Sequence, residues 1–193
     1  MFAYSSVAQG GFILMPLAVV GNNAQAKKDA LTAVVTYLII YAAMNLGAFA
    51  VIIAVARKTR SGEISSYGGL FDYAPGLAVA MAFFLFSLAG IPPLGGWIAK
   101  FGVFKALLAA GGSWAAILAV IGAVNSVIAL FYYANVAREM FMNPAPDGDV
   151  TPVRVPQALV AALGITAGVT LLVGVLPNLV LHYGDLSTFL PAG

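Results

Sequence analysis

The sequence predicts an all-α fold, a polytopic transmembrane helical bundle of about five spans in which one helix is discontinuous. Hydrophobic residues make up 62% of the 193 positions and charged residues only 8%, whereas an ordinary soluble domain has roughly 25% charged residues. Five apolar runs approach or exceed the length of about 20 residues that a crossing helix needs: residues 2–20, 30–56, 76–110, 114–142 and 157–176. Residues 1–193 are therefore expected to form a single transmembrane domain.

The composition also excludes several functions. Nine basic and seven acidic residues give a net charge of +2 without a basic cluster, so no nucleic acid partner is expected. Cysteine is absent, which excludes thiolate metal sites and iron–sulfur ligation. The only histidine, His182, is expected near the surface rather than as a metal ligand. The chain has no glycine-rich nucleotide-binding motif, and no bound metal or cofactor is expected.

The second span carries a stripe of polar residues. A polar loop with two lysines, residues 21–29, precedes this span. Tyr37, Tyr41 and Asn45 follow one another at intervals of four residues, which places them on one helical face. Such a stripe favours hydrogen bonds to a neighbouring helix, with a water-lined path as the alternative. A charged loop, residues 57–73, follows.

The third run, residues 76–110, is too long for one straight crossing. A helix of its length would measure about 52 Å, well beyond a hydrocarbon core of about 30 Å. Its middle reads GIPPLGG, where proline lacks a backbone donor and glycine tolerates irregular backbone. The residues predicted to break the helix are Gly90, Pro92, Pro93, Gly95 and Gly96. The run is either a hairpin or one crossing made of two half-helices.

The distribution of basic residues favours the single broken crossing. With five spans the two sides of the membrane receive unequal sets, Arg57, Lys58, Arg60, Arg138 and Arg154 against Lys27 and Lys28. Because positive charge accumulates in cytoplasmic loops, the N-terminus is predicted inside and the C-terminus outside. A hairpin would weaken this bias and remains the alternative. The last two spans are separated by a proline-rich loop, residues 143–156.

Lys100 is the strongest candidate for chemistry, because an ionisable residue inside a span is costly and usually marks a functional site. Burial disfavours the charged form of a lysine, so Lys100 is predicted to exchange protons as a relay group. The alternative is a lysine that snorkels to the nearest interface. Lys105 fits that alternative better and is a weaker relay candidate.

Four stretches together resemble a known family. They read AYSSVAQGGF (3–12), YLIIYAAMNLGAFAVI (37–52), SLAGIPPLGGWIAKFGVF (87–104) and NSVIALFYYANVAREMF (125–141). In this order they resemble the antiporter-like membrane subunits of respiratory complex I, and most closely subunit N, or subunit 2, of NADH-quinone oxidoreductase. The resemblance implies fourteen helices with two inverted repeats, each containing a broken helix. The chain would supply the last five, as a C-terminal fragment that lacks the N-terminal half.

The resemblance also implies a function and a site. The chain would be a proton-translocating, non-redox subunit in the cell inner (plasma) membrane, driven by electron transfer in neighbouring complex I subunits. Those partners would hold NADH, FMN, iron–sulfur clusters and quinone, while this chain contacts them and the lipid bilayer. Lys100 would serve the second half-channel, with water ordered by Tyr37, Tyr41, Asn45 and Asn125.

Two positions depart from the pattern of the family. Asn45 stands where paralogues tend to carry a lysine, and Gln9 stands where some relatives carry a histidine. Neither can store a proton near neutral pH, so the central relay would need a lysine from the missing half. The alternatives are a subunit of a multisubunit Na⁺/H⁺ antiporter and a structural fragment that conducts nothing.

Overall fold

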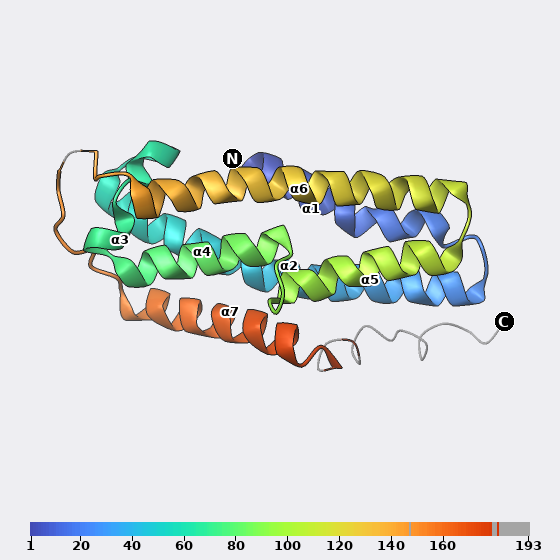
Figure 1. Ribbon diagram of the computed structural model, residues 1–193. Coiled ribbons are helices and arrows are strands. Elements are labelled where there is room, and N and C mark those ends of the chain that lie inside the picture. Colours follow the sequence, from blue (N-terminus) through green and yellow to red (C-terminus); the bar gives the residue numbers. More distant parts are fainter. Residues whose placement is uncertain (147, 179–180, 182–193) are drawn as a thin grey trace.

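The computed structural model describes residues 1–146, 148–178 and 181, and the regular structure within these ranges is helical (Figure 1). His182 lies outside the described residues. The elements in chain order are α1 (Phe2–Leu14), η1 (Met15–Val19), α2 (Ala24–Thr59), η2 (Ile64–Tyr67), α3 (Leu70–Tyr73), α4 (Pro75–Ala89), α5 (Gly95–Ala110), α6 (Ser113–Met142) and α7 (Gln157–Val175).

Four segments in the described part of the chain are long and apolar enough to cross a membrane: Phe2–Val19, Ala24–Thr59, Ser113–Met142 and Gln157–Val175. The helices α4 and α5 are shorter, with 15 and 16 residues. In Figure 1 they lie end to end, and α5 continues away from the start of α4 instead of folding back. The prediction of one broken crossing among about five spans is therefore confirmed, and the hairpin alternative is wrong.

The start of the second span differs from the prediction. The helix α2 begins at Ala24, so the expected polar loop at 21–29 is largely helical. The side chain of Asn23 explains the early start, because its Oδ1 accepts a hydrogen bond from the backbone N–H of Ala26 at 2.8 Å. Such a cap satisfies a donor that the first helical turn leaves free. Apolar periodicity alone could not reveal this polar first turn.

The long helix α2 organises the bundle by packing against α4, α5 and α7. Its fully buried side chains include Tyr37, Ile40 and Met44, each 1% exposed. Gly47 allows α4 to approach, since an added Cβ there would lie 2.2 Å from the ring of Phe84. Close packing of this kind is the main attraction between helices in lipid.

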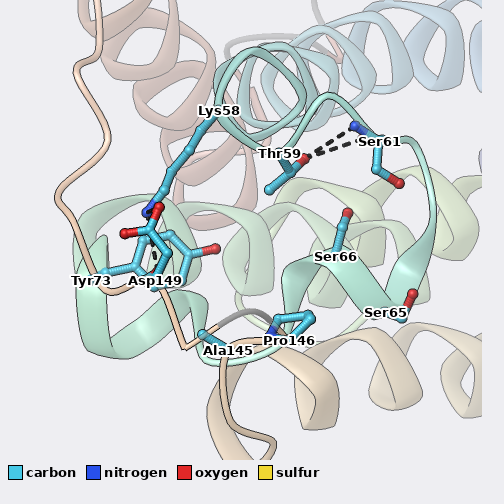
Figure 2. Close-up of a pocket in the computed structure, with 9 residues that line it drawn as sticks. All are labelled: Lys58, Thr59, Ser61, Ser65, Ser66, Tyr73, Ala145, Pro146 and Asp149. Carbon is cyan, nitrogen blue, oxygen red and sulfur yellow. Dashed lines mark hydrogen bonds and ion pairs between the residues drawn. The ribbon is translucent and has the colours of Figure 1, made fainter.

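The loop between α6 and α7 is attached to the end of α2 through Lys58 (Figure 2). The Lys58 Nζ lies 3.6 Å from a carboxylate oxygen of Asp149 and donates to the carbonyl oxygen of Thr151 at 2.5 Å. It also lies 4.0 Å from the ring centroid of Tyr73. These contacts join three segments that are far apart in the sequence.

This attachment is expected to weaken in acid. Hydrogen bonds from Thr151, and secondarily the charge of Lys58, lower the pKa of Asp149 below its ordinary value of 3.8. Because the pKa of Asp149 is lower in the folded state, the contact stabilises the loop at pH values above the ordinary pKa. This stabilisation is lost as the pH falls through the folded-state pKa. The amide of Thr151 donates to Asp149 Oδ1 at 2.9 Å, so its protection from hydrogen exchange reports the contact. We expect Asp149→Asn to lower that protection at neutral pH.

An exposed carboxylate elsewhere provides the control. Asp72→Asn removes a charge from α3, where the side chain is exposed, and is expected to leave the Thr151 amide unchanged. Equal protection of that amide in the Asp149→Asn and unsubstituted chains would contradict the assignment.

Candidate functional site

The break between α4 and α5 brings freed backbone groups into the interior. Gly90 ends α4 in the left-handed conformation, with φ of 95°, a geometry that favours glycine. The hydroxyl of the buried Ser87 accepts a hydrogen bond from the backbone N–H of Gly96 at 3.1 Å and donates to the sulfur of Met44 at 2.8 Å. Ser87 therefore satisfies a donor of the first turn of α5. Gly95 and Gly96 lie in that turn rather than in the break itself.

Lys100 lies across the break. Its side chain is 4% exposed, and its Nζ donates to the backbone carbonyl oxygen of Ala89 at 2.8 Å. This carbonyl belongs to the last residue of α4, at the end of the helix where the dipole favours a cation. The same Nζ lies 4.8 Å from the ring centroid of Phe12 on α1. The ammonium of Lys100 is thus compensated by a helix end and an aromatic face.

Gly90 provides the space for this contact. A Cβ at position 90 would lie 2.9 Å from Cδ of Lys100, closer than side-chain carbons approach. The positive φ therefore favours glycine here, and the absence of a Cβ also leaves room for the lysine side chain, which would have to shift for a larger residue. The two features that the sequence marks as unusual, the break and the lysine, form one arrangement.

A buried hydrogen-bond chain adjoins the lysine, and Gln9 on α1 is its centre. The Nε2 of Gln9 donates to the carbonyl oxygen of Leu88 at 3.1 Å and to the hydroxyl of Tyr133 at 3.3 Å. The hydroxyl of Tyr37 donates to the Oε1 of Gln9. The hydroxyls of Ser5 and Tyr133 are 2.5 Å apart. Four helices therefore contribute to a polar chain that ends one residue from the carbonyl that Lys100 binds.

The residues of the predicted polar stripe on α2 differ in their hydrogen bonds. Tyr37 bonds to Gln9 and the Tyr41 hydroxyl donates to Ser6 Oγ at 3.1 Å, so both reach α1. The expectation of interhelical hydrogen bonds is confirmed for these two residues. Asn45 is half-buried, and its side chain has no hydrogen bond to the part of the chain that the structure describes.

Asn125 and Lys105 lie apart from this chain. Asn125 is half-buried and lines a groove between α1 and α6, which also includes Phe12. Lys105 is exposed at another hollow, beside Asp29 and Thr36. Neither side chain is brought into contact with Lys100 among residues 1–146, 148–178 and 181.

Ser5, Gln9 and Tyr133 are not among the site residues that the sequence predicts, although all three are visible there as polar residues within apolar spans. One signal was available, because Ser5 and Gln9 are four residues apart in an otherwise apolar span and so share a face. Their partner Tyr133 lies more than a hundred residues away, and its proximity depends on how α1 and α6 pack. The described residues contain no group of three or more His, Cys, Asp or Glu side chains that could hold a metal ion.

Comparisons with known proteins identify the family of the chain. Residues 1–128 match the family of NADH:quinone oxidoreductase and Mrp antiporter transmembrane proteins. NADH-quinone oxidoreductase subunit N 2 of Sorangium cellulosum is 45% identical over 155 residues, which are 80% of this chain and 29% of that protein. Subunit N 1 of Chloroherpeton thalassium is 40% identical over 183 residues, which are 95% of this chain and 36% of that protein. The chain thus spans about a third of the length of these relatives.

Two solved structures are also similar. The Mrp complex from Dietzia sp. DQ12-45-1b contains a chain that matches with a TM-score of 0.76 at 25% identity, over 95% of this chain and 40% of that one. Respiratory complex I from Thermus thermophilus contains a chain that matches with a TM-score of 0.58 at 25% identity, over 93% of this chain and 44% of that one. The chain belongs to the transmembrane family shared by NADH:quinone oxidoreductase and the Mrp antiporter.

Proposed function

We propose that this chain is the C-terminal part of a proton-translocating subunit of NADH-quinone oxidoreductase, of the subunit N type. The observation that carries the proposal is the buried Lys100, whose Nζ binds the free carbonyl of Ala89 at the helix break. A lysine in an apolar bundle has few groups that compensate its charge, so small movements of these groups change its affinity for a proton. The relatives at 40% and 45% identity support this choice of enzyme.

In the proposed mechanism the neutral amine of Lys100 accepts a proton, and the resulting ammonium is held by the Ala89 carbonyl and the Phe12 ring. The ammonium releases the proton when the two half-helices move apart. The hydrogen-bond chain through Gln9 and Tyr133 fixes the end of α4 and therefore the position of the Ala89 carbonyl. Water that leads to the lysine would be ordered by Tyr37 and Tyr41, which reach α1, and further from the lysine by Asn45 and Asn125. The chain itself supplies no redox step, and oxidation energy arrives through neighbouring subunits that hold NADH, FMN, iron–sulfur clusters and quinone.

The proposed partner of this chain is the remaining part of the same subunit. An apolar groove of about 490 Å³ lies between α1 and α6, lined by residues such as Met15, Val120 and Ile128. Much of α6 is also exposed, including Val127 at 70% and Phe131 at 71%. Because the chain covers about a third of its relatives, their preceding helices are the proposed cover for this face, beside other complex I subunits and lipid. The proposed location is the cell inner membrane, with the N-terminus cytoplasmic and the C-terminus outside.

Copurification tests this assignment. An affinity tag on the chain in its native membrane is expected to retain the assembled enzyme and NADH-quinone oxidoreductase activity. A complex that contains the chain but lacks this activity would contradict the proposal.

The second candidate is a subunit of a multisubunit Na⁺/H⁺ antiporter. The higher TM-score to a chain of the Mrp complex, 0.76 against 0.58, favours this candidate, while the names of the relatives by sequence favour the first. Sodium-dependent proton exchange in vesicles that do not oxidise NADH is the result expected for the antiporter.

Removing the amide of Gln9 is expected to destabilise the bundle. Gln9→Leu leaves the Leu88 carbonyl and the Tyr37 hydroxyl without their partner inside the protein, and each unpartnered buried group costs about 1–3 kcal/mol. The midpoint of thermal unfolding of the purified chain in detergent is expected to fall accordingly. Gln25→Leu is the control, because Gln25 is exposed and its side chain bonds only to Asp29 among the residues that the structure describes. Equal midpoints for the two variants would contradict the role of Gln9.

A further inference from the structure

One end of the bundle contains a basic hollow, which we define by its charged lining. It has a volume of about 250 Å³ and lies where α2 ends and the chain approaches the start of α7. Three cations and one carboxylate line it: Arg57, Lys58, Arg154 and Asp149. The remaining lining residues are uncharged, so the basic hollow carries an excess of positive charge.

Two of the three cations are uncompensated within the part of the chain that the structure describes. Lys58 is engaged, since its Nζ lies 3.6 Å from Asp149 and donates to the carbonyl oxygens of Asp149 and Thr151. Arg57 and Arg154 are exposed and form no ion pair or side-chain hydrogen bond with the described residues. Two guanidinium groups therefore face a hollow whose single carboxylate is already paired with another cation.

The neighbouring hollow in Figure 2 shows the contrast. It shares Lys58 and Asp149 with the basic hollow, but its other polar side chains are uncharged: Thr59, Ser61, Ser65, Ser66 and Tyr73. Its two charges are opposite and 3.6 Å apart. The attraction for an anion therefore comes from the side where Arg57 and Arg154 lie.

The position along the spans identifies the depth of the basic hollow. Arg57 follows the buried apolar residues Ala54 and Val55 in the last turns of α2, and Arg154 comes shortly before α7 begins at Gln157. Both arginines thus stand where apolar helix gives way to polar loop, the level of lipid head groups. Apolar side chains are exposed one turn further into the spans, with Ile53 at 45% and Val160 at 55%.

The chemistry of the basic hollow matches a phosphodiester. Guanidinium groups present paired N–H donors that fit phosphate oxygens, and basic pockets beside membrane helices bind anionic head groups. Adjacent apolar surface would accommodate acyl chains, which a free anion does not need. We propose that the basic hollow binds the phosphate of an anionic phospholipid through Arg57 and Arg154, with its acyl chains beside α2 and α7.

Native mass spectrometry of the full chain in detergent tests this proposal, with dioleoylphosphatidylglycerol as the anionic probe and dioleoylphosphatidylcholine, a zwitterionic lipid of zero net charge, as the reference. The anionic lipid is expected to bind more tightly, and the double variant Arg57→Gln/Arg154→Gln to lower its affinity by about 30-fold, given about 1 kcal/mol per arginine near the surface. The affinity for the zwitterionic lipid should fall much less, because its choline ammonium offsets the charge of its phosphate. Arg138→Gln, an exposed arginine on α6 outside the hollow, is the matched control.

The outcomes distinguish binding of a lipid phosphate from binding of free phosphate. Equal affinity for the two lipids, or equal losses in the double variant and in Arg138→Gln, would overturn the proposal. Inorganic phosphate at millimolar concentration is expected not to displace the bound lipid; full displacement would identify the site as one for the free anion and overturn the lipid assignment. Circular dichroism of the double variant should match the unsubstituted chain, because both replaced side chains are exposed. The proposal does not depend on proton translocation, and its failure would leave the role of Lys100 untouched.

Discussion

Replacing Lys100 by methionine is expected to lower NADH-driven proton uptake by about tenfold or more in vesicles that contain the assembled enzyme. General acid–base groups typically contribute at least two orders of magnitude to the steps they serve, and methionine keeps most of the length and apolar volume of the lysine stem. The replacement removes the donor to the Ala89 carbonyl, so the amount of assembled complex must be measured beside the rate of uptake. The rate per assembled complex is the decisive quantity.

Lys100→Arg separates a proton relay from a structural cation. Arginine can donate to the Ala89 carbonyl but does not lose its proton in proteins. A relay role therefore predicts that Lys100→Arg assembles better than Lys100→Met and still fails to transport protons. Lys105→Met is the control, because Lys105 is exposed on the same helix and its loss should have a small effect. Full uptake by an assembled Lys100→Arg enzyme would remove Lys100 from the mechanism and favour a structural fragment that conducts nothing.

Gly96→Ala is expected to destabilise the bundle by about 3 kcal/mol or more, the upper range for added volume in a packed interior. An added Cβ at Gly96 would lie 1.7 Å from the backbone oxygen of Ser87, and a backbone group in a helix cannot move aside as a flexible side chain can. The change would push α5 away from α4 and lengthen the contact between Lys100 and Ala89. The measurement is the thermal unfolding midpoint of the purified chain, together with the yield of assembled enzyme.

The same helix offers a matched control in Gly102→Ala. A Cβ at Gly102 would meet its nearest neighbour, the Cβ of Ala33, at 4.0 Å, an ordinary van der Waals distance, and alanine favours helix by about 1 kcal/mol over glycine. Gly102→Ala is therefore expected to be neutral or stabilising. Comparable losses of stability in both variants would show that helical glycine in general, rather than the approach of α5 to α4, is responsible.

Gly174 on α7 allows an independent repetition of this comparison. Its added Cβ would lie 1.9 Å from the backbone oxygen of Pro93, whereas a Cβ at Gly168 would have no neighbour within 4 Å. The contrast shows that α7 also approaches the break closely. The helix break is thus covered by protein, as a broken helix in lipid requires.

Much of the fold could be predicted because lipid imposes a simple rule on the chain. Apolar runs of sufficient length become helices, and the proline and glycine residues at 90–96 mark the break. The distribution of basic residues favoured a single crossing. Helix ends were harder to predict. At Asn23, for example, a side-chain cap extends α2 into a segment whose composition resembles a loop.

Some residues of the candidate site could be predicted from the sequence and others could not. Lys100 was identifiable because a charge within an apolar run is costly wherever the helix points. Gln9 and Tyr133 were not, since uncharged polar residues are common in spans and acquire meaning only through their partners. Asn45 and Asn125 illustrate the reverse, because their polarity suggested participation while neither side chain contacts Lys100 in the described structure.

The sequence by itself determined the membrane environment, the helical spans, the position of the break and the presence of an energetically unfavourable lysine within the same apolar run. These features follow from local composition, because each backbone group or charge exposed to lipid raises the free energy independently of the packing of distant residues. Only the tertiary structure decided that Lys100 reaches back to Ala89, that Gly90 leaves room for it, and that Gln9 joins α1, α2, α4 and α6. Hydrogen-bond partners in a bundle depend on which helix faces meet, and that is set by the packing of the whole chain.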